Sequence, residues 1–321
     1  MLIQLPSSRH SSFSAYMVDG CTNTFTLYLS FLSSCPRLVA VDLSFSSTKE
    51  LNAVFHAIEL SLDTLKSVNL VQRTGWRVDN RFAEEALRHR QLKHIEGLVI
   101  DNVEIDYRSR LYGSLAIPLR SLRIRIKTDM ESYHVNVWRL LPEDRATLRQ
   151  LSLDIYGIEL DTFVDLLSSL PTQLEILDIQ CQHDGRQPLA SCYSRIFVSS
   201  PIPIEGFNSL TSLSHLTLKS FQGPSLSLLD TLCASSPNLV CIDFTRSVWV
   251  ANPAPSNPSM SISDPNRIFP ELGILTNLRQ LYHLRYLHLG YLPTIDSSAY
   301  PILTQEMKER NVRLEWAPSR A

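Results

Sequence analysis

Apolar residues recur along this chain in short clusters of the form L-x-x-L-x-L. The last two apolar positions of a cluster are two residues apart, and such side chains point to the same face of a β-strand. Each cluster therefore predicts a short strand with one apolar face. The pattern occurs nine times, at Leu38/Val41/Leu43, Leu65/Val68/Leu70, Ile95/Leu98/Ile100, Leu119/Leu122/Ile124, Leu148/Leu151/Leu153, Leu174/Leu177/Ile179, Leu213/Leu216/Leu218, Leu239/Ile242/Phe244 and Leu284/Leu287/Leu289.

The clusters return at a nearly constant interval. Six of the eight steps between their first positions are 24 to 30 residues long, close to the range of about 20–29 residues that is typical of leucine-rich repeats. The other two steps, of 39 and 45 residues, indicate insertions. The periodicity predicts a repeat architecture in which each unit contacts its neighbours.

Between the predicted strands the apolar spacing becomes helical. Leu51, Val54, Phe55 and Ile58 lie at i, i+3, i+4 and i+7, which predicts an amphipathic helix. Prolines at 36, 171 and 237 stand just before the next strand, where proline ends a helix and favours extended backbone. The sequence thus predicts an α/β leucine-rich-repeat solenoid with a curved parallel sheet on the concave side and helices on the convex side.

These motifs resemble the irregular leucine-rich-repeat regions of fungal F-box/LRR-type proteins over about Cys21 to Trp316. The resemblance implies a non-catalytic scaffold that binds a protein partner through the concave face, and substrate recognition for a ubiquitin ligase. The chain lacks a recognisable F-box, because residues 1–20 are too short and too rich in serine, and Leu141-Pro142 runs into the next predicted strand. A ubiquitin-ligase adaptor is expected as a partner only if an F-box is missing from this chain.

The chain departs from the family pattern at the turn that follows each strand. The pattern has Asn or Cys eight residues after its first Leu, whereas this sequence has residues such as Lys127, Phe221 and Ser247 there. We therefore expect the side-chain ladder that satisfies the backbone of these turns to be absent.

The domain organisation follows from the repeat. We expect a flexible N-terminal tail over 1–20, a single domain over 21–316 with insertions at about 182–208 and 246–270, and a C-terminal tail over 317–321. The second insertion contains four prolines between Pro253 and Pro265 and few apolar residues. Such a stretch is either functional or merely disordered.

Composition narrows the class of partner and the compartment. The formal net charge is -2 and the pI about 6.5, so nothing favours nucleic acid or an anionic membrane. The N-terminus lacks the pattern of a secretory signal, and no apolar run is long enough to span a bilayer. The six cysteines form no CxxC pair, so we expect reduced thiols in a cytoplasmic or nuclear protein.

The motifs of common enzyme classes are missing from the sequence. It contains no GxSxG, GxxxxGK[ST], HExxH or GxGxxG, and its nine histidines are scattered. We expect no catalysis, no metal and no cofactor. The alternatives are a loop-borne ligand-binding or hydrolytic activity on the same scaffold, and a divergent paralogue without a selected partner.

Residues that alternate with the apolar strand positions are predicted to face the concave surface. Asp101, Arg125 and Asp154 would form a row there, either as an ion-pair ladder or as a recognition patch whose arginines bind a carboxylate or phosphate. Trp249 and Tyr286 are aromatic anchor candidates. The predicted partner-binding residues are Asp42, Asn69, Asp101, Arg123, Arg125, Asp154, Asp178, Lys219, Asp243, Trp249, Tyr286 and His288.

Overall fold

The computed structural model describes the parts of the chain that form the regular elements and their connections. These are residues 12–15, 22–35, 37–45, 53–54, 56–59, 63–72, 95–103, 119–126, 146–155, 160–181, 205–221, 226–247, 271–292 and 300–318. The chain divides into two compact units, Met1–Leu153 and Asp154–Ala321.

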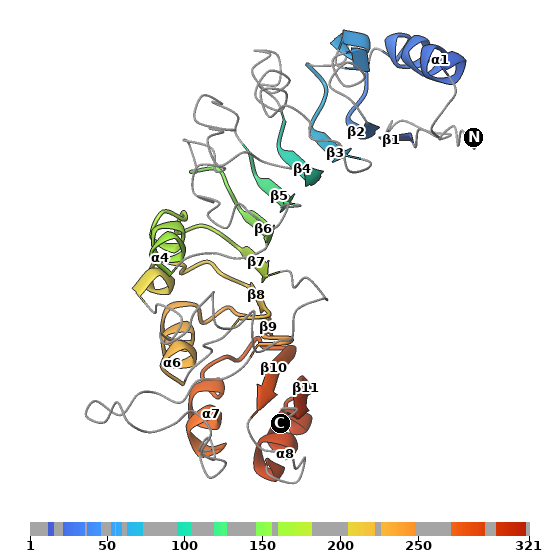
Figure 1. Cartoon of the computed structure of the whole chain (residues 1–321). Helices are drawn as coiled ribbons and strands as arrows, with labels where there is room; N and C mark the ends of the chain where they lie inside the picture. Colours follow the sequence, from blue (N-terminus) through green and yellow to red (C-terminus); the bar gives the residue numbers. More distant parts are fainter. Residues whose placement is uncertain are drawn as a thin grey trace. The chain divides into compact units, whose positions relative to one another are not determined.

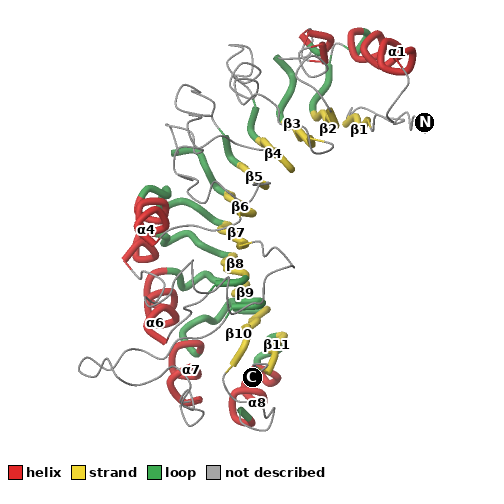
Figure 2. Tube along the Cα trace, in the orientation of Figure 1, coloured by secondary structure: helices red, strands yellow, loops and turns green. Residues whose placement is uncertain are grey.

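The first unit is built on parallel strands that follow one another in sequence order (Figures 1 and 2). Helix α1 (Thr22–Ser33) connects the first two of them. The strands are β1 (Ser12–Ala15), β2 (Ala40–Phe45), β3 (Ser67–Gln72), β4 (Gly97–Val103) and β5 (Ser121–Ile126), with β6 (Gln150–Ile155) at the boundary of the two units.

The second unit repeats this plan with better-defined helices. Its strands are β7 (Ile176–Cys181), β8 (His215–Lys219), β9 (Cys241–Asp243), β10 (Tyr286–Leu292) and β11 (Arg313–Pro318), and successive strands are parallel. The helices are α4 (Leu160–Ser168), η3 (Glu205–Ser209), α6 (Leu226–Ser235), α7 (Glu271–Leu278) and α8 (Pro301–Glu309). Figure 1 shows α4, α6 and α7 on one side of β7–β10. The predicted α/β class with an open parallel sheet is confirmed.

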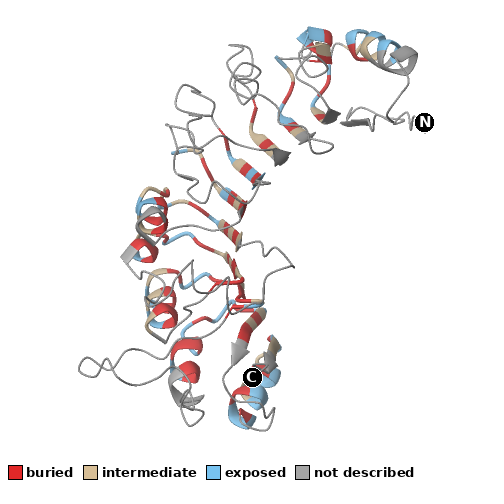
Figure 3. Cartoon of the chain, in the orientation of Figure 1, coloured by how far each residue is buried: buried red, intermediate tan, exposed pale blue. Residues whose placement is uncertain are grey.

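The core lies between these strands and helices, as the apolar spacing predicts. Strand residues alternate between buried and half-buried, and β8 reads half-buried, buried, half-buried, buried, half-buried (Figure 3). Phe163 of α4 packs against Phe221 with ring centroids 5.5 Å apart, and both are fully buried. Truncating one large buried side chain of this kind to alanine typically costs about 3–5 kcal/mol.

One backbone carbonyl in most repeats holds the start of the next strand. The oxygen of Glu96 accepts the N–H groups of Arg120 and Ser121 at 2.7 and 2.9 Å. The carbonyls at the equivalent position, one residue after the first apolar residue of the cluster, do the same at Val39, Lys66, Arg120, Glu175, Ser214 and Val240. The sequence repeat is therefore also a repeat of hydrogen bonding.

The structure differs from the predicted boundaries at three places. Ser12–Ala15, placed in the N-terminal tail by the sequence, pair with β2 as β1. The end of the first predicted insertion forms η3, where Phe207 is fully buried. Strand β11 continues to Pro318. These segments are short and carry too few apolar residues to show a period. Residues 182–204 and 248–270 of the predicted insertions lie outside the described residues.

The expected absence of side chains that satisfy the turns is wrong at Ser247. Its hydroxyl donates to the carbonyl oxygen of Leu218 at 2.7 Å and accepts the N–H of Phe221 at 3.0 Å. Ser247 is fully buried. A hydroxyl has a donor and two lone pairs, so serine performs at this turn the role that we expected only of Asn or Cys.

Candidate partner-binding face

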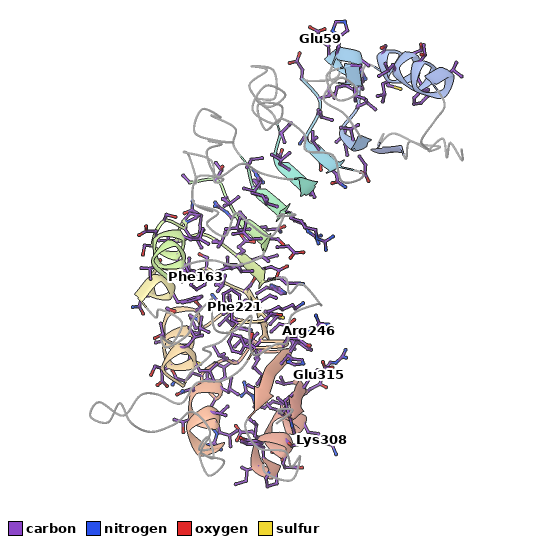
Figure 4. The ribbon with its side chains drawn as sticks, in the orientation of Figure 1. Glu59, Phe163, Phe221, Arg246, Lys308 and Glu315 are labelled. Atoms are coloured by element: carbon purple, nitrogen blue, oxygen red, sulfur yellow. The ribbon has the colours of Figure 1, made fainter. Side chains whose placement is uncertain are left out.

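The strands expose one face of polar side chains, which we call the outer face. It consists of the residues that alternate with the buried apolar positions, such as Asp178 between Leu177 and Ile179. Figure 4 shows Phe163 and Phe221 on the helix side of the strands in the second unit, and Arg246 and Glu315 on the opposite side.

In the second unit the register brings five outer-face residues into one row. Asp178 pairs with Thr217, Thr217 with Asp243, Asp243 with His288, and His288 with Glu315. Neighbouring strands lie about 4.8 Å apart, so these side chains are immediate neighbours. The sequence predicted three of the five as binding residues.

Asp243 holds the centre of this row. Its carboxylate lies 3.2 Å from the Nζ of Lys219 and accepts the backbone N–H of Thr245 at 2.9 Å and the Thr245 hydroxyl. The side chain of Asp243 is only 12% exposed, whereas that of Lys219 is 33% exposed. The aspartate therefore positions the lysine, and the lysine is the group that a partner can reach.

His288 is held in one tautomer by the turn that follows it. The backbone N–H of Gly290 donates to its Nδ1 at 2.9 Å, so the neutral ring carries its proton on Nε2. Burial lowers the pKa of His288, an effect that the nearby carboxylates of Asp243 and Glu315 partly oppose. At neutral pH the ring is an uncharged donor.

The edge of the row is a network of three side chains. The hydroxyl of Tyr286 donates to Glu315 at 3.0 Å, and the Nε of Arg313 donates to the other oxygen of that carboxylate at 2.6 Å. The Arg313 guanidinium lies 5.8 Å from the centre of the Tyr286 ring. Burial and the hydrogen bond to Glu315 raise the pKa of Tyr286 to about 12, so its phenol stays protonated.

Arg313 and Glu315 were missed by the sequence reasoning. They lie in the segment after the ninth cluster, where the signal is only the alternation of Val312, Leu314 and Trp316. That alternation could have placed both residues on the outer face.

The outer face of the first unit carries a different set of charges. Asp42 faces Asn69 in the register, and Asn69 faces Val99, which faces Arg123. Burial raises the pKa of Asp42, and a hydrogen bond from Asn69 partly opposes that shift. Arg123 and Arg125 are exposed and alternate with the buried Leu122 and Ile124.

Three predicted binding residues are buried or have side chains outside the described part of the chain. The register of β4 and β5 shifts between Ile100 and Val103, at the position of the predicted pairing of Asp101 with Arg125. The side chain of Asp101 and the whole of Trp249 lie outside the described residues. Asp154 is only 7% exposed, so it offers a partner little surface.

Burial changes the acidity of two of the described thiols. Burial raises the pKa of Cys241 to about 11 and that of Cys233 to about 12, so both are protonated thiols at neutral pH. Among the described residues, no group of three or more His, Cys, Asp or Glu side chains is arranged to hold a metal ion. Within the same residues, no helix has the length and apolar character needed to cross a bilayer.

Comparisons with known proteins give no family. No protein-family model and no curated protein matches the sequence. Among solved structures, the chain is similar to a structural-genomics crystal structure of a protein from Bacteroides fragilis, at 16% identity over 79% of this chain and with a TM-score of 0.44. The chain spans 66% of that protein's length. This likeness is too distant to carry an assignment.

Proposed function

We propose that this chain is a leucine-rich-repeat solenoid that binds a protein partner through the outer face of its strands. Three features support the repeat: nine apolar clusters at a regular interval, successive parallel strands in sequence order, and the equivalent carbonyl that holds each next strand. In a leucine-rich-repeat horseshoe the outer face is the concave face. Such surfaces serve repeat proteins as extended binding surfaces.

The observation that carries the proposal is the ordered polar row of the second unit. Lys219 is held by Asp243, Tyr286 by Glu315, and the His288 tautomer by Gly290. Side chains that are already fixed lose less conformational entropy when a partner binds. Tyrosine and arginine are also the residue types that dominate binding energy at interfaces, and Tyr286 and Arg313 lie together here.

The proposed activity is binding without chemistry. The protonated thiols of Cys233 and Cys241 and the protonated phenol of Tyr286 are suited to packing and hydrogen bonding rather than to nucleophilic attack. We place this binding in the cytoplasm or nucleus, and its cellular role in the recognition of a ubiquitin-ligase substrate. That role requires an F-box from outside this chain.

Site-specific photo-crosslinking tests the outer face. A photoreactive residue is placed at Thr217, within the row and next to Asp243, or at Asp230, an exposed position on α6. Under the proposal, Thr217 gives discrete protein adducts in cells and Asp230 does not. Identical adducts from both positions, or adducts from Asp230 alone, would overturn the proposal.

A further inference from the structure

Lys219 and His288 lie on the strands that flank Asp243, and both carry hydrogen-bond donors that no described residue accepts. The Nζ of Lys219 lies 3.2 Å from the Asp243 carboxylate, and the lysine side chain is 33% exposed. An ammonium group has three N–H donors, so this ion pair leaves two of them for a ligand. His288 is the register neighbour of Asp243 on β10, and its Nε2 has no hydrogen-bond partner within the described residues. We call Lys219 and His288 the donor pair.

Each member of the donor pair is held in place by a hydrogen-bonded neighbour. Asp243 accepts the backbone N–H and the hydroxyl of Thr245, so the carboxylate that holds Lys219 is itself held. The N–H of Gly290 donates to the Nδ1 of His288 at 2.9 Å, which leaves the proton of the neutral ring on Nε2. Donors that are fixed before binding lose less conformational entropy when a ligand arrives.

Arg246 adds a cation on the same side of the strands. Figure 4 shows it on the side opposite to Phe163 and Phe221. It is exposed and makes no hydrogen bond or ion pair with any residue that the structure describes, and its φ of +60° is a left-handed conformation that non-glycine residues seldom adopt. The described outer face of β8–β10 therefore has two cations, Lys219 and Arg246, against the single carboxylate of Asp243, a formal charge of +1.

The group that fits these donors is a carboxylate. Its single negative charge balances the local positive charge, and its two oxygens can accept from an ammonium group and an imidazole N–H together. A phosphate monoester carries a charge of about -1.5 to -2 at neutral pH, which would leave excess negative charge beside Asp243. A cationic or purely apolar ligand would leave both donors without an acceptor.

We infer that the donor pair binds one carboxylate of the protein partner, which forms an ion pair with Lys219 and accepts a hydrogen bond from His288. This inference rests on the proposed function and names the group that the outer face recognises. The carboxylate belongs to an acidic side chain or to the C-terminus of the partner, since both present the same group. Arg313 and Glu315 on the neighbouring strand pair with each other and add no net charge to the site.

Retention of the full chain on pools of immobilised short peptides tests the inference. The pools have amidated C-termini and random neutral residues around one fixed residue, which is Glu, Gln, Lys or phosphoserine, and a further Gln pool keeps its free C-terminal carboxylate. Retention on the Glu pool or on the free-carboxylate pool should exceed that on the amidated Gln pool by about threefold or more. The Glu pool identifies a side chain as the source of the carboxylate, and the free-carboxylate pool identifies a chain end.

Two matched double variants place the carboxylate on the outer face. Lys219→Gln/Arg246→Gln should bring the retention ratio close to one, because both cations of the site are removed. The control Arg279→Gln/Lys308→Gln removes two exposed positive charges at the ends of α7 and α8 and should keep the ratio of the parent. Circular dichroism verifies folding. If the first variant unfolds, Arg246→Gln alone replaces it and should still lower the ratio, since Arg246 is exposed.

Four results would overturn the inference: no preference for either carboxylate pool, an unchanged ratio in Lys219→Gln/Arg246→Gln, an equal loss in the control, or stronger retention on the Lys or phosphoserine pool. If the carboxylate preference is absent while Thr217 still crosslinks a partner, the carboxylate is wrong and the proposed function stands. If the Thr217 adducts are also absent, the proposed function falls.

Discussion

The hydroxyl of Ser247 donates to the carbonyl oxygen of Leu218 at 2.7 Å, across 29 residues of sequence. Together with the N–H of Phe221, which donates to the same hydroxyl, this bond ties the turn after β9 to the end of β8. The outer-face residues Lys219 and Asp243 lie at the ends of these two strands. The turn therefore sets the spacing of a candidate binding pair.

Replacing Ser247 by alanine should lower the free energy of unfolding by about 2 kcal/mol, because a buried donor and a buried acceptor lose their partner together. Urea unfolding followed by circular dichroism measures this. Ser235→Ala is the control, since the Ser235 hydroxyl bonds only within its own helix region and is half-exposed, and that variant should change stability by less than about 0.5 kcal/mol. Equal losses in the two variants would refute a special role for Ser247.

Gly290 should not tolerate a side chain. Its φ is +74°, and a Cβ would lie within 2.5 Å of the carbonyl oxygens of both Phe244 and Ser247. Gly290→Ala should cost about 3 kcal/mol or more. Gly97→Ala, whose Cβ would lie 3.5 Å from the Ser67 hydroxyl, should be tolerated. Thermal unfolding of the two variants measures the difference in stability, and similar melting temperatures would contradict the described turn.

Arg310 should stabilise the second unit through the end of α7. Its guanidinium donates to the carbonyl oxygens of Leu278 and Leu281 at 2.9 and 2.5 Å. Loss of this charged cap in Arg310→Ala should lower the free energy of unfolding by about 1–2 kcal/mol. Lys308→Ala, an exposed position on α8, should stay within about 0.5 kcal/mol of the parent. A larger loss in Lys308→Ala would count against the cap.

Stability should fall as the pH drops below the ordinary histidine pKa. Burial lowers the pKa of His288 from 6.5 in the folded chain, so the unfolded chain binds the proton more readily. The stabilising contribution of neutral His288 is therefore complete above about pH 6.5 and is lost as the pH falls toward the folded value. Urea unfolding measures the free energy of unfolding at pH 7.5 and 5.5. The difference between the two pH values should be smaller in His288→Asn than in the parent, because asparagine keeps an acceptor for the Gly290 N–H but does not titrate.

The same experiment distinguishes the titration of His288 from that of the glutamates Glu315 and Glu306. The pKa of Glu315 is lowered by its hydrogen bond from Arg313, and that of Glu306 by its hydrogen bond from Arg279. Their contributions are lost only as the pH falls below about 4.5, outside the measured window. An identical pH slope in parent and His288→Asn would show that His288 is not the titrating group.

The strands were predictable from sequence because their signal is local. Two apolar residues at a spacing of two, preceded by a third, mark each strand, and the nine clusters fall on β2–β10 or beside their ends. Strand β1 was not predictable, since Ser12–Ala15 carry one large apolar residue and gain order only by pairing with β2. The role of Ser247 depends on a partner 29 residues away, which no local pattern shows.

The candidate site was predictable as a face but not as a set of contacts. Alternation places Lys219, Asp243 and His288 on the outer face, but the register across strands decides which of them meet. The contact of Lys219 with Asp243 needs that register together with the turn at Thr245. The burial of Asp154 depends on the packing around β6, so it could not be predicted from its position in the pattern.

The central claim is tested most directly by measuring how tightly two matched tyrosine variants bind the partner that is recovered through the Thr217 crosslink. Tyr286 lies on the outer face, and Tyr282 is 82% exposed in the turn that precedes β10. The proposal predicts that Tyr286→Ala weakens binding by about tenfold or more, whereas Tyr282→Ala leaves it within about twofold. Unchanged affinity in Tyr286→Ala, or an equal loss in Tyr282→Ala, would contradict the assignment of the outer face as the binding surface.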